Sequence, residues 1–339
     1  MILFRTDGNS IIGMGHIMRC MSIAASFKES GQNVLFITAD HNPDQILIDN
    51  GFECDCLDSL WSDMASELSV LKKKLNIYKP ELMIIDSYSV NSVYFDALSE
   101  CIKTVYIDDL NENHWDVDAL INYNIYADQV FYANYSKSHT KLFLGHDFVP
   151  LRKEFSGCIA HIVNPVSKVL VLAGGSDPER ITERIIQSLC PQFKNIEFHF
   201  VIGGLNPRKE GIYQLTEQYS NAVLHHNIRN MSELMMMSDV AISAAGSTLY
   251  ELCACGVPTI AYALADNQLK ALDAFGQKAL VLAAGDCRNN ENFILQLQEC
   301  LLVMINDNRL RSDYSKKMQS LVDGEGPARI VERLRLMYE

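Results

Sequence analysis

The chain opens with Met1-Ile-Leu-Phe-Arg-Thr-Asp7, continues through Gly13-Met-Gly-His16, and then enters the largely apolar segment 17–26. The first piece is typical of a short buried strand, and the last carries apolar residues at helical spacing. The two glycines between them let the backbone turn tightly and leave its amides uncovered. A strand, a glycine loop and a helix in this order predict the first βα unit of a nucleotide-binding α/β domain.

His16 falls near the first turn of the predicted helix. The free N–H groups and the positive end of the helix dipole favour an anion there and disfavour a protonated imidazole. A neutral histidine beside a phosphate-binding loop has the chemistry of a general base. The same stretch also fits a histidine that only satisfies a backbone group, because Gly-x-Gly alone is a weak signal. This segment by itself leaves both interpretations open.

Short apolar segments and amphipathic segments alternate through the rest of the chain, which indicates parallel sheets covered by helices on both faces. Strands are expected at 2–5, 33–38, 82–86, 104–108, 119–122, 141–144, 168–173, 197–202, 222–225, 239–243, 258–262 and 279–283. Helices are expected at 16–30, 43–50, 60–78, 92–101, 178–190, 208–220, 231–237, 247–255, 268–276, 291–305, 307–321 and 327–337. A segment without either period, containing two prolines, separates the two sets near 150–165. We therefore predict the α/β class, with two Rossmann-like doubly wound domains, 1–155 and 156–339, facing a cleft.

Composition excludes several classes of function. The net charge of −13 argues against a broad nucleic-acid or anionic-membrane surface. No apolar run reaches the roughly 18 residues that a membrane span needs, and the N-terminus starts directly with a strand rather than a signal peptide. The ten cysteines include two Cys-x-Cys pairs, but neither has zinc-site spacing. We expect reduced thiols in a cytoplasmic protein.

Two glycine-bearing loops in the second half follow predicted strands. Gly174-Gly-Ser-Asp-Pro178 precedes a helix expected to begin at Pro178, which predicts a phosphate cradle or a plain strand-to-helix turn. Gly246-Ser-Thr248 precedes another helix, with Glu251 one turn inside it. That carboxylate could accept both hydroxyls of a ribose while Ser247, Thr248 and local amides hold a diphosphate. Thr248 and Glu251 also have the spacing of a capping box.

Polar groups follow two more strands, at Asp86-Ser-Tyr88 and at Ala265-Asp-Asn-Gln268. Both lie at predicted carboxyl ends of strands, where open α/β sheets bind ligands. The second group could contact sugar hydroxyls or cap the next helix. The common phosphate-loop, nucleophile-elbow and zinc-protease motifs are missing, so no metal is implied. A diphosphate leaving group would be stabilised by helix N-termini and backbone amides.

Taken together and in order, these segments resemble the UDP-sugar hydrolases of pseudaminic acid biosynthesis, which cleave UDP-2,4-diacetamido-2,4,6-trideoxy-β-L-altropyranose. The second half is also similar to the glycosyltransferase that makes lipid II from UDP-N-acetylglucosamine, and both families have the GT-B fold. The segments that carry the resemblance are Arg5-x-Asp7, Gly13-x-Gly15-His16-x-x-Arg19-Cys20, Asp86-Ser-Tyr88, Leu151-Arg152-x-Glu154-Phe155, Gly174-Gly-Ser-Asp-Pro178, Gly246-Ser-Thr-x-x-Glu251, Gly256-Val-Pro258, Ala265-Asp-Asn-Gln268 and Asp323-Gly-x-Gly326.

The resemblance implies a role for each matching residue. His16 corresponds to the catalytic histidine, which activates water to attack the anomeric carbon with inversion and release of UDP, without a metal or other cofactor. Substrate-binding roles are implied for Asp7, Gly13, Gly15, Arg19, Tyr88, Arg152, Asn267 and Gln268. UDP-binding roles are implied for Gly174, Gly175, Ser176, Gly246, Ser247, Thr248 and Glu251.

Three other functions fit parts of the same pattern. A GT-B glycosyltransferase would use a sugar or lipid hydroxyl in place of water, and a UDP-sugar 2-epimerase would share the fold. A nucleotide-sugar sensor would need residues 246–251 but not His16. All of these functions use a UDP-sugar as the ligand, and hydrolysis uses water as the second substrate. We expect a monomer without nucleic-acid or membrane partners.

Overall fold

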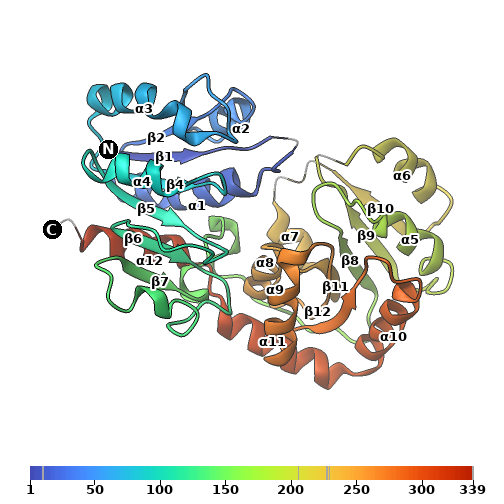
Figure 1. Cartoon of the computed structure of the whole chain (residues 1–339). Helices are drawn as coiled ribbons and strands as arrows, with labels where there is room; N and C mark the ends of the chain where they lie inside the picture. The colour runs from blue at the N-terminus through green and yellow to red at the C-terminus, as the bar shows by residue number, and fades with distance from the viewer. Residues whose placement is uncertain (10, 205, 227, 229, 338–339) are drawn as a thin grey trace. The chain divides into compact units, whose positions relative to one another are not determined.

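The computed structural model describes residues 1–9, 11–204, 206–226, 228 and 230–337. It forms two compact units, Met1–Arg152 together with Glu325–Glu339, and Lys153–Gly324. Each unit contains one parallel β-sheet with helices packed against it (Figure 1). The predicted α/β class with two doubly wound domains is therefore confirmed. Within the described residues, no helix combines the length and the apolar character that crossing a bilayer requires.

Seven parallel strands build the sheet of the first unit, in the spatial order β3-β2-β1-β4-β5-β6-β7. They are β1 (Ile2–Thr6), β2 (Val34–Thr38), β3 (Glu53–Cys56), β4 (Leu82–Asp86), β5 (Lys103–Ile107), β6 (Ala119–Asn122) and β7 (Lys141–Leu144). The chain starts at β1, moves outward to β3, and returns to β4 on the other side of β1. The carboxyl ends of β1 and β4 therefore flank the switch point, where open α/β sheets bind ligands.

The helices of this unit are α1 (Gly15–Glu29), α2 (Asp44–Asp49), α3 (Met64–Tyr78), α4 (Ser92–Ser99) and α12 (Gly326–Arg335), with short 3-10 turns η1 (Ala133–Tyr135) and η2 (His146–Phe148). Helix α3 begins later than the expected residue 60, because the Asp63 side chain caps it by accepting a hydrogen bond from the Ser66 N–H. Strand β3 was not predicted, since Glu53-Cys-Asp-Cys56 lacks an apolar run. Its half-exposed position at the edge of the sheet explains this composition.

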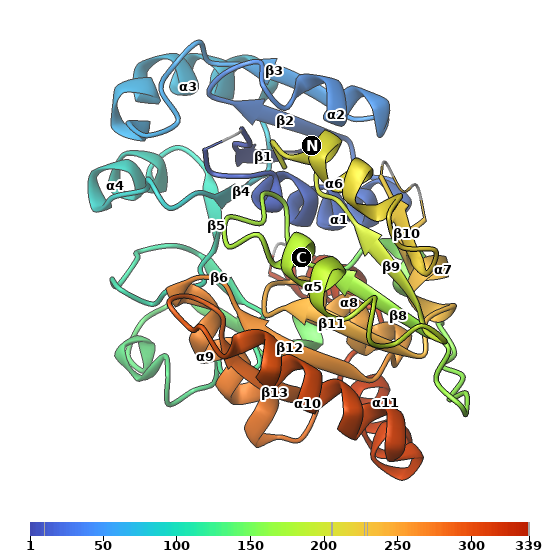
Figure 2. The same ribbon diagram turned by 90° about the vertical axis from the view of Figure 1, so that its right-hand side faces the viewer.

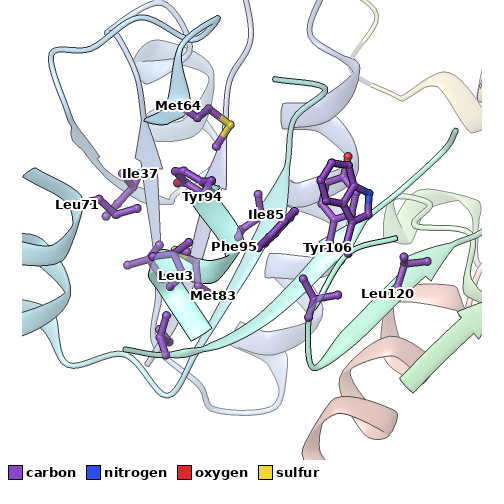
Figure 3. Close-up of a cluster of buried hydrophobic side chains, with 14 of the residues drawn as sticks. Leu3, Ile37, Met64, Leu71, Met83, Ile85, Tyr94, Phe95, Tyr106 and Leu120 are labelled. Carbon is purple, nitrogen blue, oxygen red and sulfur yellow. The ribbon is translucent and has the colours of Figure 1, made fainter. Parts of the chain in front are cut away.

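An apolar core lies between the sheet and helices α3 and α4 (Figure 3). Leu3 of β1 belongs to it, together with Leu71 of α3 and Phe95 of α4. Successive strand residues point to opposite faces, so Phe4 packs on the other face against Phe27 of α1, with ring centroids 6.2 Å apart. Burial of each large apolar side chain contributes about 1.5–3 kcal/mol, which favours this two-faced arrangement.

Arg5 lies fully buried on the α3 side of β1 and is held by carboxylates. It donates two hydrogen bonds of 2.7 Å to Glu67 of α3 and one of 2.6 Å to Asp7. Tyr94 donates to Glu67 at 2.8 Å, and the Ala39 N–H donates to Asp7 Oδ1 at 2.7 Å. Asp7 thus connects Arg5 of β1 to the loop after β2, with one carboxylate oxygen bonded to each.

Six parallel strands build the sheet of the second unit, in the order β10-β9-β8-β11-β12-β13. They are β8 (Lys168–Leu172), β9 (Glu197–Val201), β10 (Ala222–His225), β11 (Val240–Ala244), β12 (Thr259–Ala263) and β13 (Leu282–Asp286). The helices are α5 (Ile181–Ser188), α6 (Lys209–Thr216), α7 (Met231–Met236), α8 (Thr248–Cys255), α9 (Asp266–Gln277), α10 (Phe293–Asn306) and α11 (Asn308–Leu321), with the turn η3 (Lys153–Phe155). Figure 2 shows these strands side by side, and the switch point lies between β8 and β11.

The expected helix start at Pro178 is wrong. Helix α5 begins at Ile181, because Asp177 and Arg180 have left-handed backbone angles, with φ of 47° and 56°. The Asp177 carboxylate accepts the first-turn N–H groups of Ile181 and Thr182 at 2.8 and 3.0 Å. This side chain therefore occupies the helix end at which we had expected an anion.

The expected assignment of the whole C-terminal segment to the second domain is also wrong. Residues 325–339 belong to the first unit, where α12 packs against α1. Arg329 donates to the carbonyl of Asp147 at 3.1 Å. Gly326 lies so close to the backbone that a Cβ there would be 2.1 Å from the Val149 oxygen. Figure 1 draws this red helix among the blue and green elements of the first unit.

Candidate active site

The loop between β1 and α1 closes on itself. Asn9 and Gly13 exchange two backbone hydrogen bonds of 3.3 and 2.9 Å, and Gly13 has a φ of +78° that suits glycine. The Gly13 N–H is therefore used inside the loop, which corrects our expectation that both glycine amides are uncovered. Gly15 is exposed and opens α1, so its N–H belongs to the first helical turn, which lacks intrahelical acceptors.

His16 is the second residue of α1 and is 7% exposed. Its Nδ1 lies 2.6 Å from Oδ1 of Asp86, the last residue of β4. A carboxylate only accepts hydrogen bonds, so this contact places the hydrogen on Nδ1 and leaves a lone pair on Nε2. Among the described residues, none bonds Nε2. The switch point of the first sheet thus presents a histidine oriented by a carboxylate.

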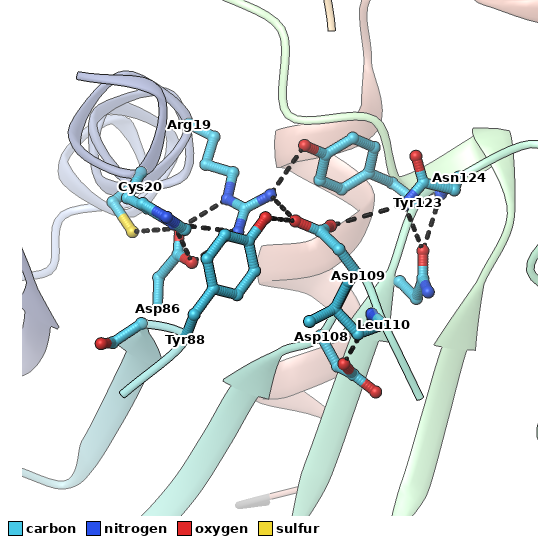
Figure 4. Close-up of polar contacts among 12 residues, drawn as sticks. Arg19, Cys20, Asp86, Tyr88, Asp108, Asp109, Leu110, Tyr123 and Asn124 are labelled. Atoms are coloured by element: carbon cyan, nitrogen blue, oxygen red, sulfur yellow. Dashed lines mark hydrogen bonds and ion pairs between the residues drawn. The ribbon is translucent and has the colours of Figure 1, made fainter. Parts of the chain in front are cut away.

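Arg19 connects this pair to the next strand (Figure 4). One turn after His16 on α1, its guanidinium donates two hydrogen bonds of 2.5 Å to Asp86 and one of 2.7 Å to Asp109. Tyr88 donates to the same oxygen of Asp109 at 2.7 Å, and its ring meets the imidazole edge-on with centroids 4.7 Å apart. The contacts restrain the imidazole from two sides.

The charges around Asp86 determine its ionisation state. Burial alone would raise the pKa of Asp86, but the charges of Arg19 and His16 and their hydrogen bonds hold it well below its usual range. Asp86 therefore stays ionised. Arg19 carries one positive charge and Asp86 and Asp109 carry two negative charges, so a proton taken up by His16 would bring the formal charge of these four residues to zero. The arrangement can accept a proton at Nε2 and hold the resulting imidazolium.

Sequence reasoning missed part of this cluster. Asp86 was noted only as part of a strand-end motif, and its contact with His16 was not predicted. Asp109, and Tyr123, which accepts from Arg19 at 2.9 Å, were not singled out. Asp109 comes two residues after β5 and Tyr123 directly follows β6. Inspection of every strand end in the first half would have found both.

The predicted substrate residues of the first unit fall into two groups. His16, Arg19 and Tyr88 come together around Asp86 and Asp109. The two carboxylate oxygens of Asp7 instead accept hydrogen bonds from Arg5 and from the Ala39 N–H. Arg152 is half-buried where the first unit ends.

The predicted UDP-binding residues of the second unit lie at its own switch point. Gly174, Gly175 and Ser176 are exposed after β8, and Gly174 has a φ of +77°. The loop after β9 lies against them, because a Cβ on Gly203 would be 2.3 Å from the Gly175 oxygen. A Cβ on Gly246, after β11, would be 3.9 Å from Gln268 Nε2, so these two predicted residues are neighbours.

The alternative interpretations of these loops are partly settled. Ser247 is the N-cap of α8 without a capping side-chain bond, and Thr248 is already helical. Thr248 is therefore not the N-cap residue that a Thr248–Glu251 capping box requires, and Glu251 lies in the first turn. Gln268 accepts a hydrogen bond of 2.9 Å from the Leu264 N–H, so it supports the turn before α9, while Asn267 is exposed.

Comparison with known proteins gives relatives of modest identity, and no protein-family model matches the chain. The chain is 26% identical to Bacillus subtilis SpsG, a spore coat polysaccharide biosynthesis protein, over 98% of this chain and 97% of SpsG. It is 26% identical to the Campylobacter jejuni UDP-2,4-diacetamido-2,4,6-trideoxy-beta-L-altropyranose hydrolase, over 74% of this chain and 86% of that enzyme. It is 26% identical to Methanocaldococcus jannaschii MJ1062 over 78% of its own length, and the match spans only 55% of that protein.

Solved structures define the fold. Acinetobacter baumannii MurG matches with a TM-score of 0.67 at 12% identity, over 98% of this chain and 99% of MurG. The Neisseria meningitidis UDP-GlcNAc 2-epimerase bound to UDP-GlcNAc matches with a TM-score of 0.69 at 14% identity, over 98% and 99% of the two chains. The chain is thus a homologue of the UDP-2,4-diacetamido-2,4,6-trideoxy-beta-L-altropyranose hydrolases and has the GT-B fold.

Proposed function

We propose that this protein hydrolyses a UDP-linked 2,4-diacetamido-2,4,6-trideoxyhexose at the anomeric C–O bond, with inversion, and releases UDP and the free sugar for pseudaminic acid synthesis. The observation that carries the proposal is the His16–Asp86 contact of 2.6 Å at the switch point of the first sheet. The name of the Campylobacter jejuni relative supports the choice of substrate class. The proposal includes action in the cytoplasm.

In the proposed reaction, Nε2 of His16 takes a proton from water as the water oxygen attacks the anomeric carbon. The bond between that carbon and the diphosphate oxygen breaks, and its electron pair leaves with UDP. Asp86 holds the imidazolium at Nδ1, and Arg19 holds Asp86. The Tyr88 ring packs edge-on against the imidazole and restricts its rotation, and Asp109 accepts the hydrogen bond of the Tyr88 hydroxyl. No step of this scheme needs a metal ion.

The second unit is proposed to bind the nucleotide. Glu251, in the first turn of α8, would accept the ribose hydroxyls. Ser247, Thr248 and the exposed loop Gly174–Ser176 would hold the diphosphate through hydroxyls and amides. We place the anion at α8 rather than at α5, because the Asp177 carboxylate occupies the first-turn N–H groups of α5, whereas Ser247, the N-cap residue of α8, makes no side-chain capping bond.

The test is incubation of the purified chain with a panel of UDP-diacetamido sugars in the absence of any acceptor, with mass spectrometry of the products. Release of UDP and of a free diacetamido sugar supports hydrolysis, and proton NMR of the first-formed sugar reports inversion. His16→Ala should abolish UDP release while UDP binding persists, and His139→Ala, at an exposed histidine of the same unit, should leave turnover unchanged. Release only after addition of an acceptor would indicate a transferase. Near-normal turnover of folded His16→Ala would overturn the mechanism.

A further inference from the structure

Three side chains of types that can ligate metal ions lie together at the edge of the first sheet opposite β7. His41 follows β2, Cys56 ends the edge strand β3, and Asp58 follows it. One nitrogen, one sulfur and one oxygen from these residues all lie within 4.8 Å of one another. Asp58 Oδ1 is 3.8 Å from His41 Nε2 and 3.6 Å from Cys56 Sγ. Ligands of a tetrahedral zinc ion, bound at about 2.0–2.3 Å, have mutual separations close to these.

The histidine of this set is oriented as a metal ligand. Its Nδ1 lies 2.6 Å from Oδ2 of Asp44, the first residue of α2. The carboxylate accepts the Nδ1 hydrogen and leaves the lone pair on Nε2, the atom that faces Asp58. Histidines that bind metals commonly have such a carboxylate behind them, which fixes the ring and increases its basicity. This contact is an observation separate from the clustering of the three ligand atoms.

The sulfur is also positioned from behind. The Asp58 N–H donates to Cys56 Sγ at 3.3 Å, and Sγ lies 3.4 Å from the carbonyl of Ala39. Cys56 is half-buried, whereas the side chains of His41 and Asp58 are 70% and 86% exposed. An ion could therefore enter from solvent and be held on one side by a fixed sulfur. Asp44 and Asp58 supply negative charge that no cationic side chain among the described contacts of this set offsets.

We propose that His41, Cys56 and Asp58 bind a zinc-type transition-metal ion, with water as the fourth ligand and Asp44 as the residue that orients His41. The mixture of thiolate, imidazole and carboxylate suits Zn²⁺ and its spectroscopic substitute Co²⁺, and it disfavours Ca²⁺ and Mg²⁺, which prefer oxygen. Binding would displace the thiol proton of Cys56 and join the loops after β2 and β3. The site is separate from the His16 cluster, and it does not depend on the proposed hydrolysis.

The test is titration of the reduced, metal-free full chain with Co²⁺, followed by the absorption of thiolate-to-cobalt charge transfer. We expect one ion per chain, displaced by one equivalent of Zn²⁺. His41→Ala and Cys56→Ser should abolish the signal. The matched controls His139→Ala and Cys101→Ser remove an exposed histidine and an exposed thiol of the same unit, and both should retain it.

A second pair of variants tests the orientation of His41. Asp44→Asn should weaken Co²⁺ binding by about 10- to 100-fold, as for other residues that orient metal-bound histidines. Asp40→Asn removes the same charge from the residue before His41, whose carboxylate accepts from the Asn42 N–H, and should change the affinity by less than about threefold. Absence of a charge-transfer band, or equal binding by the wild type, His41→Ala and Cys56→Ser, would overturn the proposal.

Discussion

Replacement of Asp86 by asparagine tests whether the carboxylate orients His16. In the wild type Asp86 accepts the Nδ1 hydrogen at 2.6 Å and leaves Nε2 as the base. Without the charge, Arg19 Nη2, which lies 3.1 Å from Nδ1, becomes the strongest neighbouring donor. A donor at Nδ1 moves the imidazole hydrogen to Nε2, and in that tautomer Nε2 cannot accept a proton from water.

The size of the effect follows from two contributions. A hydrogen bond to a charged group contributes about 1.5–3 kcal/mol, and each 1.36 kcal/mol in the barrier is tenfold in rate. Loss of the Asp86–imidazolium contact therefore lowers kcat by about 10- to 100-fold. The tautomer change adds to this, so we expect a total loss of about 10²- to 10⁴-fold, the upper figure being typical when an amide replaces such a carboxylate.

The assay is acceptor-free UDP release, measured together with UDP affinity and near-ultraviolet circular dichroism. UDP affinity should stay within about threefold, since the nucleotide is proposed to bind the other unit. Asp109→Asn is the matched control, because it also removes a carboxylate partner of Arg19 but does not touch His16. Its loss of kcat should be at least about tenfold smaller. If both variants fold and lose activity equally, or if Asp86→Asn keeps kcat within about threefold of the wild type, the orienting role is refuted.

Four further outcomes follow from the contacts. The lowered pKa of Asp86 stabilises the folded chain fully above the usual Asp pKa of about 3.9, and this stabilisation is lost as the pH falls through the folded pKa. Urea unfolding between about pH 5 and about pH 3 should thus show a steeper loss of stability for the wild type than for Asp86→Asn, and equal slopes would contradict this. Glu67→Gln should lower the free energy of unfolding by about 3 kcal/mol because it leaves buried Arg5 with one carboxylate; a loss below about 1 kcal/mol would argue against the network. Gly326→Ala should cost about 3 kcal/mol or more, since a Cβ there would be 2.1 Å from a backbone oxygen, and an unchanged thermal midpoint would contradict the packing of α12. Glu251→Gln should weaken UDP binding by about 10- to 100-fold in calorimetry, and an unchanged affinity would place the ribose elsewhere.

Much of the fold was readable from local patterns. Short apolar segments such as 2–5 and 239–243 predicted the central strands β1 and β11, because a strand buried on both faces needs apolar residues throughout. The edge strand Glu53–Cys56 escaped, since partial exposure removes that requirement. Helix starts were less accurate, because they depend on caps such as Asp63 and Asp177 whose side-chain contacts have no periodic signal.

For the candidate site, the sequence by itself determined some of the residues that could carry chemistry. His16 stands out because a histidine after a glycine loop falls at a helix N-terminus, and the family resemblance, which runs over nearly the whole chain, implies the same residue. Glu251 stands out in the same way, one turn after a glycine loop in the second half. The placement of His16 and Glu251 near the start of a helix depends only on the residues next to them in the sequence, so local patterns can predict it.

Only the tertiary structure decided the partners of those residues. Asp86 is 70 positions from His16, and Asp109 is 90 positions from Arg19, yet both contacts are shorter than 3 Å. The winding order of the sheet sets such contacts, because it places the ends of β1, β4 and β5 side by side. The return of α12 to the first unit has the same cause: the apolar face of that helix is buried against α1, and no local pattern names the surface that receives it.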